Sequence, residues 1–262
     1  MRATTTPANA AAGPRHAPPS LAARLFRWHR WLGWVVGLQV LAWVLGGALF
    51  AWLPFQAWVK GREAVSTPQL ALPVEALARS ATALAQLPGP VTAMQAVPSA
   101  AGPAWRVRVA GGAEPRWLRA DGQPWAPPDA AAVQAFAAQL YRGGGPLAEV
   151  RHLGRAPQRL GIVREAQGGA QGLWRVRFDD ALQTRLYVDA HSGELLAVRN
   201  EAWVWYDFFW RLHVMDWPDG EDFNTPWLRA AALVALGLML TGAVMSLRAA
   251  WRAVRRGAGH RR

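Results

Sequence analysis

The stretch "RWHRWLGWVVGLQVLAWVLGGALF", residues 27–50, places a histidine among arginines and tryptophans and then continues as a long apolar run. No charged residue occurs from Trp31 to Leu53. At about 1.5 Å per residue that run forms a helix roughly 34 Å long, whereas the hydrocarbon core of a bilayer is about 30 Å thick. We therefore predict a transmembrane helix within residues 24–58.

The other end of the chain carries a second apolar run. Residues 230–247 contain no charged residue and are bounded by Arg229 and Arg248, so they reach the minimum length of a span. The first run is too long for the apolar core of a cleaved signal peptide, and it is followed by Pro54 and bulky aromatic residues. The second span is predicted at residues 227–250, so two helices bracket the chain.

The formal net charge of +12 lies almost entirely at the two ends of the chain. Residues 1–30 hold five arginines and residues 248–262 hold six more, with no acidic residue in either segment. Short basic flanks mark the cytoplasmic side of a membrane protein, so both termini are expected in the cytoplasm and the central region outside it. The nearly neutral middle argues against a nucleic-acid partner. The composition of residues 1–23 predicts a disordered tail, and residues 251–262 form a basic one.

The sequence contains no cysteine. Disulfides, iron–sulfur clusters and covalently attached c-type haem are therefore excluded. It also contains no nucleotide-binding loop, no HExxH motif and no nucleophile elbow. No hydrolytic site is predicted.

The central region contains an internal repeat of two copies. Residues 105–108 and 174–177 have the same sequence, WRVR, in strand-like alternation. Each is preceded by a helical stretch and a short strand and followed by a strand that enters a glycine turn. We predict two helix-plus-antiparallel-sheet repeats, at residues 59–126 and 127–199, and expect the valine of each WRVR segment in a core. The predicted fold class is an α+β membrane protein in which two transmembrane helices bracket these repeats.

Residues 200–226 are predicted to form an aromatic interfacial helix and a turn. Trp203, Tyr206 and Trp210 recur at helical spacing, which gives the helix an aromatic face suited to a membrane surface. The acidic run within residues 216–222 is typical of a solvated turn. Contact with a ferric substrate is the alternative interpretation of that run.

Two of the six histidines lie at predicted membrane boundaries. From His29, steps of four reach Gly33 and Gly37, so one helical stripe carries an imidazole followed by two residues without side chains. A porphyrin ligated by His29 would have room against that stripe, and Arg27 and Arg30 are suited to its propionates. The alternative is structural, because Gly-x-x-x-Gly is a common helix-dimerisation pattern and an interfacial histidine can lie among lipid headgroups.

Three segments resemble a known family. "LYVDAHSGELLAV" is similar to the closing hairpin of a PepSY domain, and "LFRWHRWLGWVVGLQVLAWVLGG" together with "FFWRLHVMDW" resembles the PepSY-associated transmembrane helix family. The resemblance implies a bacterial inner-membrane protein with a periplasmic central region and, for some members, a haem-containing ferric-siderophore reductase used in iron uptake. It implies haem b as the cofactor. His29 and His213 match ligand positions of the family, and Arg211 is near enough in sequence to serve propionates on the second side.

One chain cannot present both histidines to one iron, because they are separated by nearly the thickness of the membrane. Bis-histidine ligation therefore predicts a homodimer whose two-fold axis pairs each histidine with its mate. In this interpretation the dimer lies in membrane lipid and passes electrons from a donor such as quinol to an acceptor such as a ferric siderophore. The alternative is a cofactor-free, membrane-anchored PepSY module that binds or regulates an envelope partner.

Overall fold

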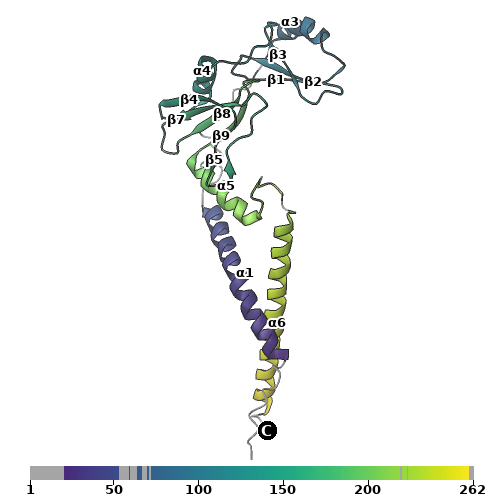
Figure 1. Ribbon diagram of the computed structural model, residues 1–262, viewed down its shortest axis with the longest axis vertical. Coiled ribbons are helices and arrows are strands. Elements are labelled where there is room, and N and C mark those ends of the chain that lie inside the picture. The colour runs from purple at the N-terminus through teal and green to yellow at the C-terminus, as the bar shows by residue number, and fades with distance from the viewer. Residues whose placement is uncertain are drawn as a thin grey trace, which may run out of the picture. The chain divides into compact units, whose positions relative to one another are not determined.

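The computed structural model describes residues 21–52, 59, 64–66, 70, 72–218, 220–222 and 224–259. It contains two compact units: one comprises the chain up to Trp43 and from Asn224 onward, and the other comprises Val44–Phe223. Figure 1 labels the helices and strands. Most of the predicted N-terminal tail, residues 1–20, and the end of the predicted basic tail, residues 260–262, lie outside the described residues.

Two long helices form the predicted spans. Helix α1 is Leu21–Trp52 and helix α6 is Pro226–Gly259, and each contains a stretch long and apolar enough to cross a membrane. Apolar side chains such as Leu38 and Leu233 are largely exposed, so the surrounding lipid is the medium that removes them from water. The prediction of two spans around an α+β region is confirmed. Helix α6 also continues past residue 250, because alanine and arginine both favour a helix.

The first repeat consists of one helix and a three-stranded sheet. Its elements are α3 (Val74–Ala85), β1 (Val91–Val97), β2 (Ala104–Val109) and β3 (Arg116–Arg119). The strands pair antiparallel in the order β1-β2-β3. Val107 on the central strand is fully buried, as the alternation of the WRVR segment predicts. Gly122, in the turn after β3, has a φ of +81°, a conformation that favours glycine.

The second repeat has the same helix and strands with two additions. Its elements are α4 (Ala130–Leu140), β4 (Leu147–Leu153), β5 (Gln158–Arg159), β6 (Val163–Arg164), β7 (Leu173–Phe178), β8 (Arg185–Asp189) and β9 (Leu195–Arg199). The main sheet is antiparallel in the order β4-β7-β8-β9, so β9 adds a fourth strand. The β5–β6 hairpin forms a separate two-stranded sheet.

Helix α4 packs on the main sheet and makes the core of the second repeat. Asp129 caps the helix, since its Oδ1 accepts a hydrogen bond from the amide of Ala132 at 2.8 Å. Val133 and Leu140 of α4 belong to one cluster with Val176 of β7, and all three are fully buried. The expectation of a core valine in the second repeat is confirmed, and burial of such side chains is the main favourable term in folding.

The two repeats are joined through the turn between β8 and β9. The carbonyl of Gly193 accepts a hydrogen bond from the amide of Ala100 at 2.8 Å, and the Ser99 hydroxyl donates to the carbonyl of Ser192 at 2.6 Å. Gly193 has a φ of +68°, and a Cβ at this position would lie 2.6 Å from the Ser99 Oγ. Glycine is therefore required here both for the backbone conformation and for the close approach.

The segment before α3 pairs with the second repeat. The amide of Ser66 donates to the carbonyl of Leu140 at 2.9 Å, and the amide of Arg142 donates to the carbonyl of Ala64 at 2.8 Å. Residues 64–66, which lie in the range predicted for the first repeat, 59–126, therefore pair with the second repeat.

Candidate functional site

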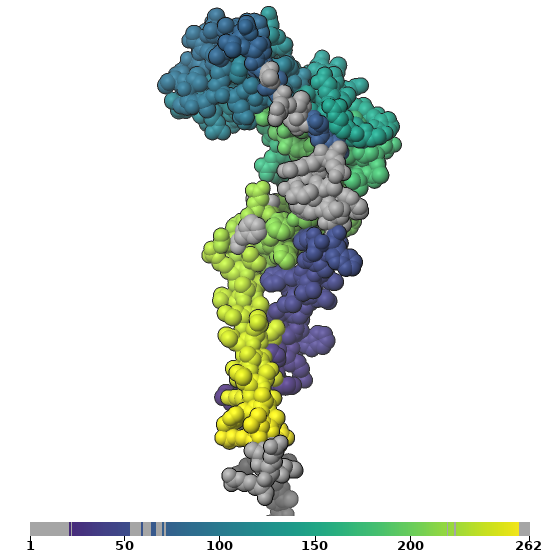
Figure 2. Space-filling view, turned by 180° about the vertical axis from the view of Figure 1, so that it is seen from behind, coloured from purple at the N-terminus to yellow at the C-terminus, as the bar shows by residue number. Residues whose placement is uncertain are grey.

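Helices α1 and α6 meet at His29. The imidazole Nδ1 lies 2.8 Å from Oγ1 of Thr241, and Figures 1 and 2 both show the two helices in contact near this end of α1. Thr241 lies within the apolar run 230–247 of α6. The predicted ligand thus has a polar partner inside the apolar stretch of the second span.

This contact fits an imidazole that carries a proton on Nδ1. The Thr241 hydroxyl also lies 2.9 Å from the carbonyl oxygens of Gly237 and Leu238, and a hydroxyl has a single proton to donate. When the threonine donates that proton to the backbone of its own helix, its oxygen accepts a hydrogen bond from Nδ1–H of His29 and the ring lone pair is on Nε2. Metal-ligating histidines commonly have this arrangement, with the other ring nitrogen held by a hydrogen bond.

Three glycines near this contact have different surroundings. A Cβ built on Gly242 would lie 3.1 Å from Cε1 of His29, so this glycine gives the imidazole room to lie against α6. A Cβ on Gly33 or Gly37 has no atom within 4 Å among the described residues. The α1 stripe that follows His29 is therefore open, which leaves space for a planar ring.

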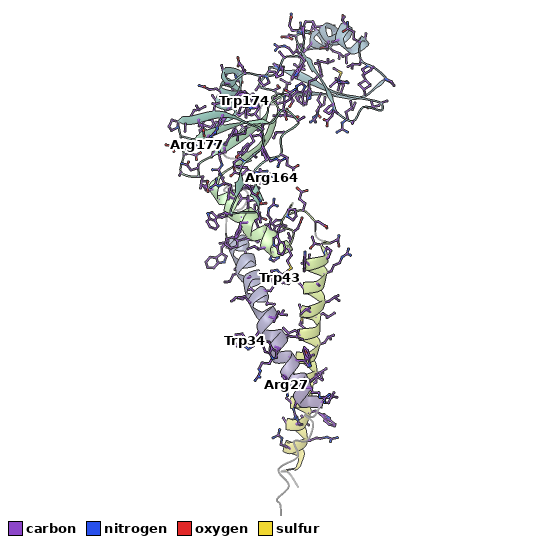
Figure 3. All side chains as sticks on the ribbon, in the orientation of Figure 1. Arg27, Trp34, Trp43, Arg164, Trp174 and Arg177 are labelled. Atoms are coloured by element: carbon purple, nitrogen blue, oxygen red, sulfur yellow. The ribbon has the colours of Figure 1, made fainter. Side chains whose placement is uncertain are left out.

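The two arginines predicted to serve propionates on α1 are both exposed, and Figure 3 labels Arg27. Neither Arg27 nor Arg30 makes a side-chain hydrogen bond or an ion pair with any residue that the structure describes. Arg30 lines a shallow hollow of about 320 Å³ together with Trp31 and Trp34. Their contact with a propionate stays a prediction.

Helix α5, Glu201–Val214, follows the second repeat. Tyr206 and Trp210 share one face of the helix, as their spacing predicts, and their rings stack with centroids 6.1 Å apart. Phe50, in the last turn of α1, lies against that face, with its ring centroid 4.7 Å from that of Tyr206. The aromatic face of α5 thus packs on the end of the first span.

The second predicted ligand, His213, belongs to this aromatic cluster. Its ring stacks on Trp210 with centroids 6.2 Å apart and meets Phe50 edge-on at 6.3 Å. A haem at His213 would have to share this crowded space with two aromatic rings. The ligand role of His213 stays a prediction, and its surroundings fit a haem less well than those of His29.

Arg211 already has partners within the fold. Its Nε donates to Oδ2 of Asp207 at 2.5 Å, and its Nη1 donates to the carbonyl oxygens of Trp217 and Pro218 at 3.0 Å and 2.6 Å. The side chain is buried. Arg211 therefore fastens the turn after α5 to the helix, and its predicted contact with a propionate stays a prediction.

The acidic run after α5 forms a turn with internal hydrogen bonds. Asp216 is buried, and its Oδ2 accepts hydrogen bonds from the amides of Glu221 and Asp222, both at 3.0 Å. Asp219 lies outside the described residues. Among the residues that are described, no group of three histidine or carboxylate side chains could hold a metal ion. These contacts favour the interpretation of the run as a structural turn.

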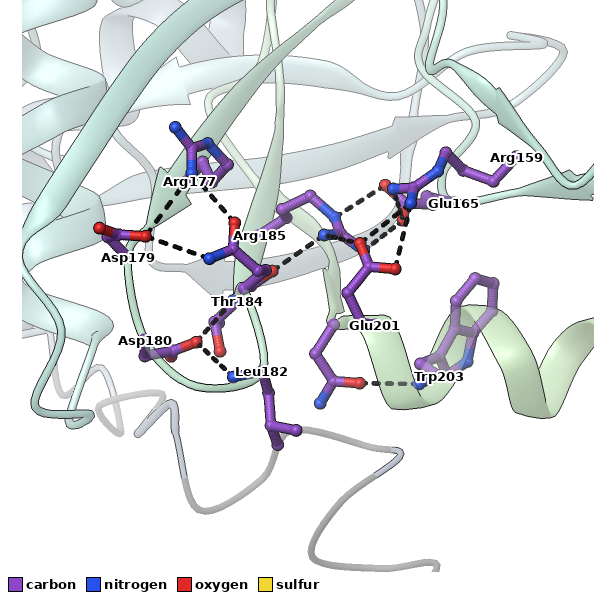
Figure 4. Close-up of polar contacts among 12 residues, drawn as sticks. Arg159, Glu165, Arg177, Asp179, Asp180, Leu182, Thr184, Arg185, Glu201 and Trp203 are labelled. Carbon is purple, nitrogen blue, oxygen red and sulfur yellow. Dashed lines mark hydrogen bonds and ion pairs between the residues drawn. The ribbon is translucent and has the colours of Figure 1, made fainter.

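A buried ionic network attaches α5 to the second repeat (Figure 4). Glu165, whose side chain has no exposed surface, accepts hydrogen bonds from Nε and Nη2 of Arg185 at 3.1 Å and 2.6 Å and from the hydroxyl of Tyr187. Nη1 of Arg185 donates to Glu201 in the first turn of α5 at 2.8 Å. Burial lowers the pKa of Arg185, but Glu165 and Glu201 more than offset it, so that pKa lies above its ordinary value. The pKa of Tyr187 lies above its ordinary value, mainly because the side chain is buried and also because the Glu165 carboxylate is negatively charged.

The same elements surround a cavity of about 890 Å³. Its walls include Trp203, Tyr206 and Trp210 from α5, and Arg164 and Arg199 from the second repeat. Small-molecule sites in proteins have volumes of this order. Sequence reasoning did not identify this cavity, because Arg164 and Arg199 come from separate strands and the aromatic wall comes from a helix.

Sequence reasoning also did not single out Thr241 and Gly242. The signal was present, since a hydroxyl followed by a glycine interrupts an otherwise apolar run. Their importance depends on the position of His29 across the helix contact, which a single sequence does not reveal.

Two apolar spans around helix-and-sheet repeats define a membrane protein with a large folded region between its two transmembrane helices. The chain belongs to the PepSY-associated TM region family, whose sequence model matches residues 26–262. The match includes both spans and both repeats, and it confirms the family resemblance found in the sequence. No curated protein and no solved structure matches the chain.

Proposed function

We propose that this protein is a haem b electron-transfer protein of the bacterial inner membrane that acts as a ferric-siderophore reductase in iron uptake. The observation that carries the proposal is the hydrogen-bond contact between Nδ1 of His29 and Oγ1 of Thr241 at 2.8 Å, because a histidine that ligates iron through Nε2 commonly has its Nδ1 held in this way. The open stripe at Gly33 and Gly37 supports it, because a planar ring needs a helix face without side chains.

In this proposal His29 and His213 each pair with the same residue of a second copy, so that a homodimer holds two haems. Bound haem supplies a one-electron carrier between a quinol donor on one side and a ferric-siderophore acceptor on the other. Thr241 fixes the orientation of the His29 imidazole. Arg27 and Arg30 supply cations at the membrane surface, where propionates need them.

The direct test is the absorption spectrum of the protein. Protein purified in detergent from haem-sufficient cells is expected to have a b-type Soret band at about one haem per chain. Acid acetone should release all of the pigment, because the sequence has no cysteine to tether it. A colourless protein would reject the redox function.

The arginine distribution supports a topology in which both termini are cytoplasmic and the repeats are periplasmic. Reporter fusions after Arg262 and within residues 122–130 are expected to report opposite compartments. If both fusions report from the same side, one of the two helices does not cross the membrane.

A cofactor-free module that binds an envelope partner is the second candidate. It is favoured by the neighbourhood of His213, where the imidazole packs in an aromatic cluster and Arg211 fastens a turn. For this function the purified protein would be folded but colourless, and the same spectrum distinguishes the two candidates.

A further inference from the structure

The cavity beside α5 has a cationic wall that the proposed electron transfer does not use. Arg199, at the end of β9, and Arg164, at the end of β6, both line it. Figure 3 labels Arg164 beside α5, against which β6 packs. Two guanidinium groups from different strands therefore face one space.

Arg199 is held in place by backbone carbonyls and an aromatic ring. Its Nε donates to the carbonyl of Glu165 at 2.8 Å, its Nη1 donates to the carbonyl of Val198 at 3.0 Å, and its guanidinium lies 4.1 Å from the ring centre of Trp203. Within the described residues it forms no ion pair, and its Nη2 donates no hydrogen bond. Burial lowers the pKa of Arg199, although the charges of Asp207 and Glu165 act in the opposite direction. A partly desolvated cation that forms no ion pair with a described residue gains from a bound anion.

Arg164 adds a second positive charge to the cavity wall. Its side chain is exposed and makes neither a hydrogen bond nor an ion pair in the part of the chain that the structure describes. Two carboxylates of the lining are already paired, since buried Glu165 pairs with Arg185 at 2.6 Å and partly buried Asp207 pairs with Arg211 at 2.5 Å. The strand side of the cavity therefore has an excess of positive charge.

The remaining acidic residues lie at the rim. Glu221 and Asp222 line the cavity from the turn after α5, and both are exposed. Water and salt screen exposed charges more than buried ones, so these two carboxylates weaken an anion site at the strand wall without abolishing it.

We propose that this cavity binds an oxyanion, a phosphate or a carboxylate, that is attached to a ring or another apolar body. The guanidinium groups of Arg199 and Arg164 match the two oxygens of such a group. Trp203, Tyr206 and Trp210 offer flat apolar surfaces to the rest of the molecule. The cavity of about 890 Å³ is large enough for a ligand of this size.

The test is calorimetric titration of the full-length protein with phenyl phosphate, in micelles of an uncharged maltoside detergent at low salt. Saturable binding is expected, and inorganic phosphate should bind more weakly because it has no ring. Arg164→Gln should weaken the binding of phenyl phosphate about tenfold, since it removes a charged donor whose side chain makes no hydrogen bond or ion pair with any described residue. Arg199→Lys should also weaken binding, because lysine keeps the charge but loses the Nη2 donor and the planar contact with Trp203 that orients it.

Arg151→Gln is the matched control, because Arg151 is an exposed arginine of β4 that does not line the cavity. It should leave the Kd within about twofold of the wild-type value, which corresponds to a change of about 0.4 kcal/mol or less in binding free energy. Absence of saturable binding, or an equal effect of Arg164→Gln and Arg151→Gln, would overturn the proposal. The titration does not depend on haem, so His29→Ala should bind phenyl phosphate as the wild type does.

The same titration distinguishes two sources of the oxyanion. Phosphatidylglycerol added to the micelles should displace phenyl phosphate if the natural ligand is a lipid headgroup. If phosphatidylglycerol does not compete, the ligand is a soluble phosphate or carboxylate. Either result supports the oxyanion site, provided that Arg164→Gln weakens the binding of the probe.

Discussion

Replacing His29 with alanine is expected to remove about half of the haem carried by the purified wild-type protein, because each histidine pair holds a separate iron. His213→Ala should remove the other half. Thr241→Val keeps the shape of residue 241 but removes the acceptor of the Nδ1 hydrogen bond, so haem affinity at this site should fall at least about tenfold. Haem content per chain and haem titration of the apoprotein measure both effects.

Gly33→Leu tests whether haem binding needs the open stripe on α1. It fills that stripe without changing a ligand. No described atom lies within 4 Å of a Cβ at Gly33, so there is space for the start of a leucine side chain, which would fill the stripe next to His29. Haem content should fall although no ligand is changed. Ala42→Leu adds the same bulk to an exposed position on roughly the opposite face of α1 and should keep the haem. Unchanged haem content in His29→Ala would reject the ligand role.

Glu165→Gln is expected to lower the free energy of unfolding by about 3 to 5 kcal/mol, because it leaves a buried guanidinium without its main counter-charge. The side chain of Arg185 is 4% exposed and that of Glu165 is 0% exposed, so water cannot replace the lost carboxylate. Tyr187 also loses a charged acceptor. The midpoint of urea unfolding, followed by circular dichroism of the full-length protein in micelles, measures the change.

Glu149→Gln is the control for a partly exposed ion pair. Glu149 pairs with Arg175 at 2.7 Å, but its side chain is 32% exposed, so its loss should cost about 1 kcal/mol or less. Equal destabilisation by Glu149→Gln and Glu165→Gln would contradict the importance of burial in this network.

Local patterns in the sequence were sufficient for the architecture. The uncharged run after His29 predicts a span because length and hydropathy alone define one. The two WRVR segments predict equivalent strands, and they form β2 and β7 as the central pairing strands of their repeats. The contacts of Ala64 and Ser66 with the second repeat were not predictable, because they depend on pairing across a long separation in the chain.

The candidate site was predictable only where it depends on one helix. The stripe of His29 and the two glycines follows from helical geometry. The role of Thr241 depends instead on the contact between α6 and α1, which are far apart in the sequence. Glu165 and Arg185 look like ordinary surface charges in the sequence. Their burial arises when the short β5–β6 hairpin and the start of α5 cover the sheet, and two-residue strands give no detectable periodicity.

The turn at Gly193 has a consequence for how the protein can change over generations. Any side chain at this position would have to push against Ser99 and the backbone of the other repeat. A substitution of Gly193 therefore requires a matching change in residues 99–101, which couples the evolution of the two copies at this turn even where their sequences differ elsewhere.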